Sequence, residues 1–182
     1  TWAFTVTFNV TRPPFNDPRV RRAVHLAVSR QQLAAAYAQT DDIRMGTRWC
    51  HPSSPLATPE EEVLKLPGYR EEKDEDIAEA KRLMEAAGYP DGLTDVVLLL
   101  RGTTGPGVEI YGPAFQDLLR RSIGITCELR PVDGAVYFDV VSGGEFHMTS
   151  GVPAGAINDP SDYWGQWFMT GAAQNYGGYS NP

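Results

Sequence analysis

Residues 96–129 read VVLLLRGTTGPGVEIYGPAFQDLLRRSIGITCEL, and they predict a strand, a turn, a helix and a second strand in succession. The first five residues are a continuous apolar run, which is typical of a strand buried on both faces of a parallel sheet. A glycine-rich turn follows at 102–107. The apolar residues of 111–119 then recur at helical spacing, with Pro113 forcing either a kink or a late start, and Gly124 ends the helix. A helix that joins two such strands indicates an α/β fold.

Further strands and helices are expected on both sides of this stretch. Residues 4–10 alternate between apolar and polar side chains, as a strand does. Asp17 and Pro18 supply the N-cap and first residue of an amphipathic helix, and Ser29 with Gln32 resembles a capping box that starts a second helix. The first helix should bury Val20, Ala23, Val24 and Ala27 and leave Arg19, Arg21 and Arg22 in water.

The remaining segments continue the alternation. Residues 41–73 carry four prolines and no sustained apolar period, which predicts mostly surface loop. A helix is expected from Asp74, with the carboxylates of 71–80 in its first turn and on its solvated face. Asp133 should cap another helix, and 146–152 is the last strand candidate. The residues expected to point inward from these two helices are Ile77, Ala80, Leu83, Met84, Ala87, Val136, Tyr137, Val140 and Val141.

An aromatic cluster follows the Asp-Pro pair at 159–160, where a further helix is expected to start. The helical spacing of these rings favours packing in the core over a wall on which a ligand stacks, although some of them can do both. The cluster comprises Tyr163, Trp164, Trp167 and Phe168.

Composition narrows the class of protein. The chain has 182 residues, 42% of them hydrophobic, and is expected to be a single domain over 1–182. Its net charge of −7 and scattered arginines argue against nucleic acid as a partner, and no apolar run is long enough to span a membrane. The chain opens on a strand pattern, so we expect an excised part of a longer protein. Cys50 and Cys127 either form one bridge or remain two thiols, with Cys127 packed in a strand.

The sequence shows no catalytic or metal-binding constellation. The turn at 102–107 lacks the lysine of a phosphate-binding loop and the spacing of a dinucleotide site. Cys50 and His51 are neighbours in sequence, which is no evidence that they meet an orienting group in space. The three histidines, His25, His51 and His147, lack metal-ligand spacing. We therefore predict a protein without enzyme activity, catalytic residues, bound metal or cofactor.

Four motifs together resemble one known family, the extracellular solute-binding proteins of the peptide, nickel and oligosaccharide class (family 5), which serve ABC importers. The family's N, P-F-x-D and x-V-R-x-A motifs resemble FNVTRPPFNDPRVRRAVHLAVSR at 8–30. Its A-K-x-L-L-x-E-A-G-Y-x-D-G resembles AKRLMEAAGYPDG at 80–92, and its I-G-I helix end resembles LLRRSIGI at 118–125. Its late D-P and N-Y-x-G-Y-S-N-P resemble 159–182. The resemblance spans nearly the whole chain.

The resemblance implies a fold, a location and partners. The fold would be a periplasmic-binding-protein-like (type II) lobe, layered α/β/α around a mixed, mostly parallel sheet. The chain would be most of the second of two lobes that close on a small-molecule or peptide-like solute. The full-length protein would deliver this solute to an ABC permease. It would be extracytoplasmic, either periplasmic or a cell-surface lipoprotein, and would touch the membrane only through a lipid anchor outside this chain.

The resemblance also implies a ligand site at the ends of the strands. Arg101 matches an arginine that binds the ligand carboxylate in dipeptide-binding relatives. Peptide binders also carry a tryptophan and an aspartate just before the D-P. Pro153 and Ala156 stand at or near those places, and neither supplies the ring or the charge that pairs with a peptide's amino group. The residues expected to bind ligand are Arg101, Gly102, Thr103, Thr104, Pro153, Ala154, Gly155, Ala156 and Asp159.

Two alternatives stay open at this stage. One is a sensory or regulatory ligand-binding module of the same fold, which the domains attached in the full-length gene would reveal. The other is a hydrolase that uses Cys50 and His51.

Overall fold

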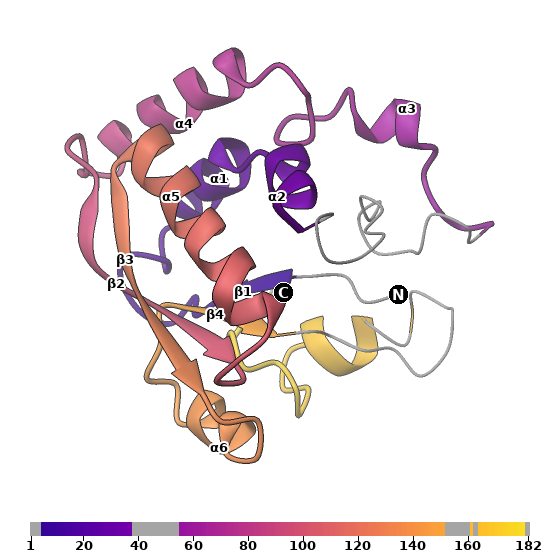
Figure 1. Cartoon of the computed structure of the whole chain (residues 1–182), viewed down its shortest axis with the longest axis vertical. Helices are drawn as coiled ribbons and strands as arrows, with labels where there is room; N and C mark the ends of the chain where they lie inside the picture. Colours follow the sequence, from indigo (N-terminus) through magenta and orange to yellow (C-terminus); the bar gives the residue numbers. More distant parts are fainter. Residues whose placement is uncertain (1–4, 38–54, 152–160, 162–163, 181–182) are drawn as a thin grey trace.

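The computed structural model describes residues 5–37, 55–151, 161 and 164–180. Within them, four strands form one sheet in the order β1–β4–β2–β3 (Figure 1). β2 runs parallel to β3 and to β4, whereas β1 pairs antiparallel with β4. The sheet is therefore mixed and mostly parallel, as predicted. The strands span Thr5–Phe8 (β1), Leu93–Arg101 (β2), Ile125–Val132 (β3) and Met148–Gly151 (β4).

Helices cover both faces of this sheet (Figure 1). The described segments contain α1 (Pro18–Ala27), α2 (Arg30–Tyr37), α3 (Glu60–Val63), α4 (Asp74–Ala86), α5 (Gly112–Ile123) and α6 (Tyr137–Ser142). Two π-helical turns are η1 (Gly107–Tyr111) and η2 (Trp164–Phe168). The helices α1, α4 and α5 share the main core with one face, and α6 packs on the other. The predicted α/β/α layering is confirmed.

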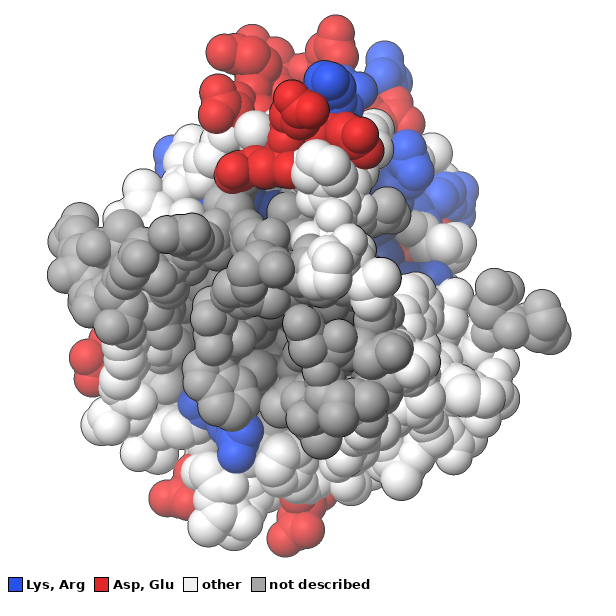
Figure 2. Space-filling model, turned by 90° about the vertical axis from the view of Figure 1, so that its right-hand side faces the viewer, with Lys and Arg blue, Asp and Glu red and all other residues white. Residues whose placement is uncertain are grey.

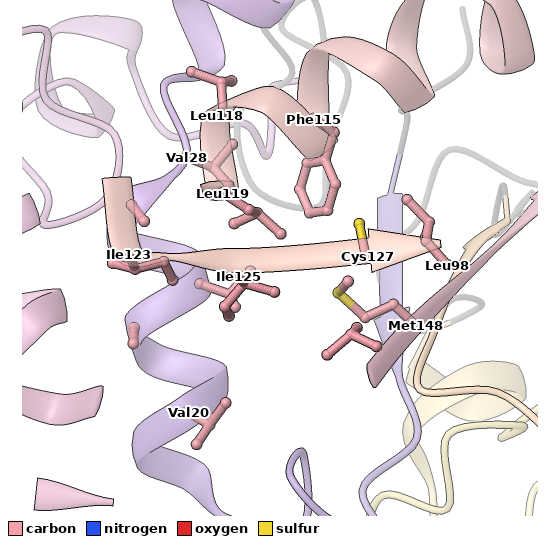
Figure 3. Packing of buried hydrophobic residues seen from close by; sticks show 14 of the residues in the cluster. Val20, Val28, Leu98, Phe115, Leu118, Leu119, Ile123, Ile125, Cys127 and Met148 are labelled. Carbon is pink, nitrogen blue, oxygen red and sulfur yellow. The ribbon is translucent and has the colours of Figure 1, made fainter. Parts of the chain in front are cut away.

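The central strand β2 shows how one apolar run serves both faces. Because successive side chains of a strand alternate, Leu98 and Leu100 join the main core while Leu99 joins the smaller core under α6. All three are fully buried. Figure 3 shows the main core, where Phe115 and Leu119 of α5 lie beside β3. The strand-turn-helix-strand prediction for 96–129 is therefore confirmed, and β2 begins slightly earlier, at Leu93.

The helices α1 and α2 begin where their capping residues predict. Asp17 accepts a hydrogen bond from the backbone amide of Arg19 at 2.8 Å and caps α1 directly before Pro18. The Ser29 hydroxyl accepts one from the Gln32 amide at 3.3 Å and starts α2. The predicted apolar face of α1 is buried, comprising Val20, Ala23, Val24 and Ala27.

The two ends of α5 follow its proline and glycine. Pro113 lies in the first turn of α5, where its missing N–H is tolerated, and the π turn η1 leads into this helix without a break, so the helical backbone starts before the proline. Gly124 ends the helix with φ +71°. A Cβ on Gly92 would lie 2.2 Å from the Gly124 carbonyl oxygen, so the chain entering β2 passes the end of α5 only as glycine.

Several predictions for individual side chains were wrong. Val136 and Val140 are 48% and 37% exposed, because the short α6 turns only one stripe toward the sheet, namely Tyr137 and Val141. Asp76 is buried instead of solvated. Its carboxylate accepts hydrogen bonds from the Gly68 amide and the Lys73 ammonium, both at 2.8 Å, which offset the cost of burying the charge.

The aromatic segment after the Asp-Pro pair also differs from the prediction. It forms the π turn η2, Trp164 is 47% exposed, and Trp167 and Phe168 are half-buried. These three rings are therefore not core residues, because a single helical turn has no second turn to bury its face. Tyr163 lies outside the described residues, as do 41–54. The described part of the predicted long loop is irregular apart from α3.

Candidate functional site

The carboxyl ends of β2 and β4 lie side by side. Leu100 is paired with Ser150 in parallel strands, so β2 and β4 end at the same edge of the sheet. Open α/β sheets bind ligands at this edge. Gly102 turns the chain away with φ +96° while its amide donates a hydrogen bond of 2.7 Å to the Val132 carbonyl. Thr103 and Thr104 follow and are exposed.

Arg101 is held against two aromatic rings. Its guanidinium carbon lies 5.0 Å from the ring centroid of Phe138 and 5.8 Å from that of Tyr137. Cation–π attraction of this kind orients the side chain and leaves the planar N–H fork free. Among the described residues, Arg101 makes neither a hydrogen bond nor an ion pair. Its donors therefore remain available to a ligand.

Tyr137 fixes the rings to the sheet. Its hydroxyl lies 2.7 Å from the Thr149 hydroxyl and donates a hydrogen bond of 2.9 Å to the Ser150 carbonyl. Burial raises the pKa of this phenol above its ordinary value, so Tyr137 stays neutral at physiological pH. The end of β4 thus anchors α6, and α6 in turn places Phe138 next to Arg101.

Further aromatic rings extend the contact toward η2. The Phe138 ring lies 6.0 Å from that of Tyr176, which lies 6.0 Å from Trp167 in an edge-to-face arrangement. These rings and Arg101 line a small pocket of about 10 Å³, together with Thr7, Val141 and Thr149. Such a volume holds about one water-sized group.

Figure 2 shows one face of the molecule with its charged side chains gathered at the end that carries α3 and α4. The acidic residues there include Glu60, Glu61 and Glu62 of α3. Charge is sparser at the opposite end of this face. Lys and Arg side chains lie beside the carboxylates at the end that carries α3 and α4.

The structure describes only part of the predicted site, and the ligand-binding role of its residues stays a prediction. It places Arg101, Gly102, Thr103 and Thr104 together at the sheet edge. The other predicted ligand residues lie outside the described residues, and these are Pro153, Ala154, Gly155, Ala156 and Asp159.

Sequence reasoning missed two of the rings that line the same pocket as Arg101. Phe138 lies beside apolar residues of α6 and was not singled out. Tyr176 belongs to the late N-Y motif, which indicated the family but no chemical role for this residue. Trp167 was expected to pack in the core, with a role in a ligand-stacking wall left open.

The described histidines and the described cysteine make contacts that are typical of structural residues. His25 contacts Arg30 and the Pro67 carbonyl, and His147 accepts a hydrogen bond of 3.1 Å from the Val97 amide. Cys127 is a free, buried thiol whose pKa is raised by burial to about 11, so it is a poor nucleophile at neutral pH. The described residues hold no cluster suited to a metal ion. Cys50 and His51 lie outside the described residues.

Residues 1–175 match the family model of bacterial extracellular solute-binding proteins, family 5 Middle. The chain belongs to this family. Membership confirms the predicted family and the extracytoplasmic location, and the family members it resembles are binding proteins rather than enzymes. No helix among the described residues could cross a membrane.

Curated relatives of this family 5 chain are much longer than it is. It is 29% identical over 159 residues to the probable deoxycholate-binding periplasmic protein YgiS of Escherichia coli K12, covering 86% of this chain and 28% of that protein. It is 31% identical over 90 residues to the glutathione-binding protein GsiB of Salmonella typhimurium, covering 49% of this chain and 15% of that one. The chain thus spans less than a third of these relatives.

Solved structures of periplasmic binding proteins share the fold. The Escherichia coli murein tripeptide binding protein MppA superposes with a TM-score of 0.81 at 22% identity, over 98% of this chain and 34% of that one. DppA from Helicobacter pylori, solved in complex with the peptide STSA, gives 0.75 at 21% identity, over 98% and 33%. The predicted fold class is confirmed.

Proposed function

We propose that this chain is one lobe of a two-lobed solute-binding protein of an ABC importer, and that Arg101 binds an anionic group of the solute at the cleft. One observation carries the proposal. Arg101 is exposed at the carboxyl end of β2, is oriented by the rings of Tyr137 and Phe138, and makes no hydrogen bond or ion pair within the described part of the chain.

The chemistry of the guanidinium selects the ligand group. Its planar fork fits a carboxylate with two parallel hydrogen bonds, which are stronger than bonds between neutral groups. Peptides, glutathione and deoxycholate, which the names and titles of relatives mention, all carry a carboxylate. This common group supports an anion-binding role for Arg101 without fixing the rest of the solute.

The remaining parts of the lobe would complete the cleft. Thr103 and Thr104 of the turn after β2 are exposed and offer their hydroxyls at the same edge. Residues 153–156 and Asp159 would supply shape and backbone hydrogen bonds from the neighbouring strand end. Closure on a solute requires that the closed state gain contacts from a second lobe, so the isolated chain would hold part of the ligand contacts only. The closed form would then meet the permease.

A thermal-shift screen on the full-length protein tests this function. The panel contains tri-alanine, glutathione and deoxycholate, each beside a derivative in which every carboxylate is converted to an amide. We expect a carboxylate to raise the melting temperature, and Arg101→Ala to abolish or strongly reduce that shift. Arg22→Ala is the matched control, because Arg22 is also exposed, also lacks a hydrogen bond or ion pair to the described residues, and lines a different pocket between α1 and α4.

Two results would contradict the proposal. One is an Arg101→Ala protein that keeps the full shift, which would remove Arg101 from the site. The other is a preference for the amides over the carboxylates, which would remove the anionic ligand.

A further inference from the structure

Trp167 holds a buried hydrogen-bond donor with no partner. Its indole Nε1 is shielded from solvent, and it makes no hydrogen bond within the described residues. Native proteins leave few buried donors unpaired, because each loses its bonds to water without replacement. An orphaned donor of this kind therefore indicates an acceptor from outside the described residues, which a bound solute would supply.

The orphaned donor lies at the same pocket as Arg101. Trp167 and Arg101 both line it, and its volume of about 10 Å³ has room for a single oxygen-sized group. The Tyr137 and Thr149 hydroxyls at this pocket already bond to each other, and Tyr137 also bonds to the Ser150 carbonyl. The free hydrogen-bonding capacity of Arg101 and Trp167 consists of donors only.

The charge of the pocket restricts what can enter. The ring faces of Tyr137 and Phe138 are already in contact with the guanidinium of Arg101, so a ligand ammonium there would meet a like charge. A carboxylate offers an acceptor oxygen to each of the two donors. A carboxamide offers one acceptor, and its NH₂ group would turn a donor toward a donor.

We therefore propose that Trp167 is a specificity-determining residue, whose indole N–H binds one oxygen of the solute's carboxylate while Arg101 binds the other. This inference rests on the proposed function of Arg101. It adds that the pair distinguishes a carboxylate from the corresponding amide, and that the solute presents this group without an ammonium beside it.

Calorimetric titration of the full-length protein tests the pair. The probes are the tightest-binding carboxylate among tri-alanine, glutathione and deoxycholate, and the corresponding amide. Trp167→Phe keeps an aromatic ring and removes the N–H. We expect this variant to bind the carboxylate about tenfold more weakly, because one hydrogen bond to a charged group is lost. The ratio of carboxylate to amide affinity should fall by a similar factor. Trp164→Phe, in the same turn, should leave both affinities within about twofold.

The outcomes separate this inference from the proposed function. If Trp167→Phe keeps the affinity and the ratio while Arg101→Ala loses them, Trp167 is no ligand donor and its N–H meets only water. If Arg101→Ala also keeps them, or if no carboxylate binds, the proposed function fails as well.

A second measurement follows ligand binding in the unsubstituted protein and uses variants only to assign one resonance. In a ¹⁵N-labelled protein, the indole N–H resonance that disappears in Trp167→Phe, or otherwise the one left unassigned by the single substitutions of the other tryptophans, belongs to Trp167. Adding the carboxylate should move this resonance downfield, and adding the amide should move it less. An unmoved resonance at saturating carboxylate would overturn the inference.

Discussion

Arg101 and Arg30 make the same contact in two different settings. Arg30 lies 4.2 Å from the ring centroid of Tyr69, at the junction of α1, α2 and the loop before α4, and Arg101 lies over Tyr137 and Phe138. Arg30, however, also donates hydrogen bonds to the carbonyls of Gly68 and His25 and to the His25 ring. Arg101 makes none within the described residues.

The difference shows how to separate a structural arginine from one available to a ligand. Stacking on an aromatic ring occurs at both and therefore does not discriminate. The hydrogen bonds do, because a guanidinium whose donors are already paired has nothing left for a solute. We therefore expect changes around Arg30 to affect folding and changes at Arg101 to affect binding.

The largest effect is expected from Gly68→Ala, beneath Arg30. A Cβ at Gly68 would lie 2.4 Å from His25 Nε2 and 2.9 Å from the His25 carbonyl oxygen, at φ +87°. The clash and the left-handed backbone together should lower the free energy of unfolding by about 3–4 kcal/mol, measured by urea denaturation.

Gly88→Ala isolates the backbone contribution. Gly88 has φ +90° and nothing lies within 4 Å of an added Cβ. The substitution should therefore lower the free energy of unfolding by only about 1–2 kcal/mol. Equal losses in the two variants would show that the packing against His25 is not tight.

The next effect compares the two arginines directly. Arg30→Ala removes the donors from the part-buried carbonyls of Gly68 and His25 and should cost about 2–3 kcal/mol of unfolding free energy. Arg101→Ala, at an exposed site without hydrogen bonds, should change it by less than about 0.5 kcal/mol. If Arg101→Ala proved as destabilising as Arg30→Ala, Arg101 would be a structural residue.

A smaller effect is expected from pH. Because the guanidinium of Arg30 can only donate, His25 Nδ1 accepts and Nε2 carries the hydrogen toward the Pro67 carbonyl. Burial, and then the charge of Arg30, lower the pKa of His25 from 6.5 to about 4. The unfolded chain therefore binds more protons between these values, and stability falls as the pH drops from about 6.5 to about 4.

The expected loss over this window is about 1–2 kcal/mol, since solvent screens a half-buried ring. It is measured as the urea midpoint from pH 7 to pH 4. His25→Gln should flatten the slope, and an unchanged slope in that variant would assign the pH dependence to other groups. Tyr137, beside Arg101, adds no pH dependence of stability between pH 4 and pH 7, because its pKa is raised further above this range.

The comparison also explains what the sequence could predict. Helix ends and strands depend on neighbours in the chain, so Asp17, Ser29, Gly124 and the run before Arg101 gave correct predictions. Arg101 itself was found from its place after a strand, together with the family resemblance.

Other features depend on residues far apart in sequence. The burial of Asp76 follows from its contacts with Gly68 and Lys73 in the folded loop. The contact of Phe138 with Arg101 follows from the docking of α6 on β4 through Tyr137, and Trp167 reaches the same pocket from η2. Hydrophobic periodicity and motif spacing do not predict such contacts between residues far apart in sequence.

A crystal structure of the full-length protein with a bound carboxylate solute would test the role of Arg101 most directly. We predict the solute carboxylate within hydrogen-bond distance of the Arg101 guanidinium, which should still lie over the rings of Tyr137 and Phe138. A solute bound elsewhere, with the Arg101 donors paired to water or to the protein's own carboxylates, would contradict this prediction.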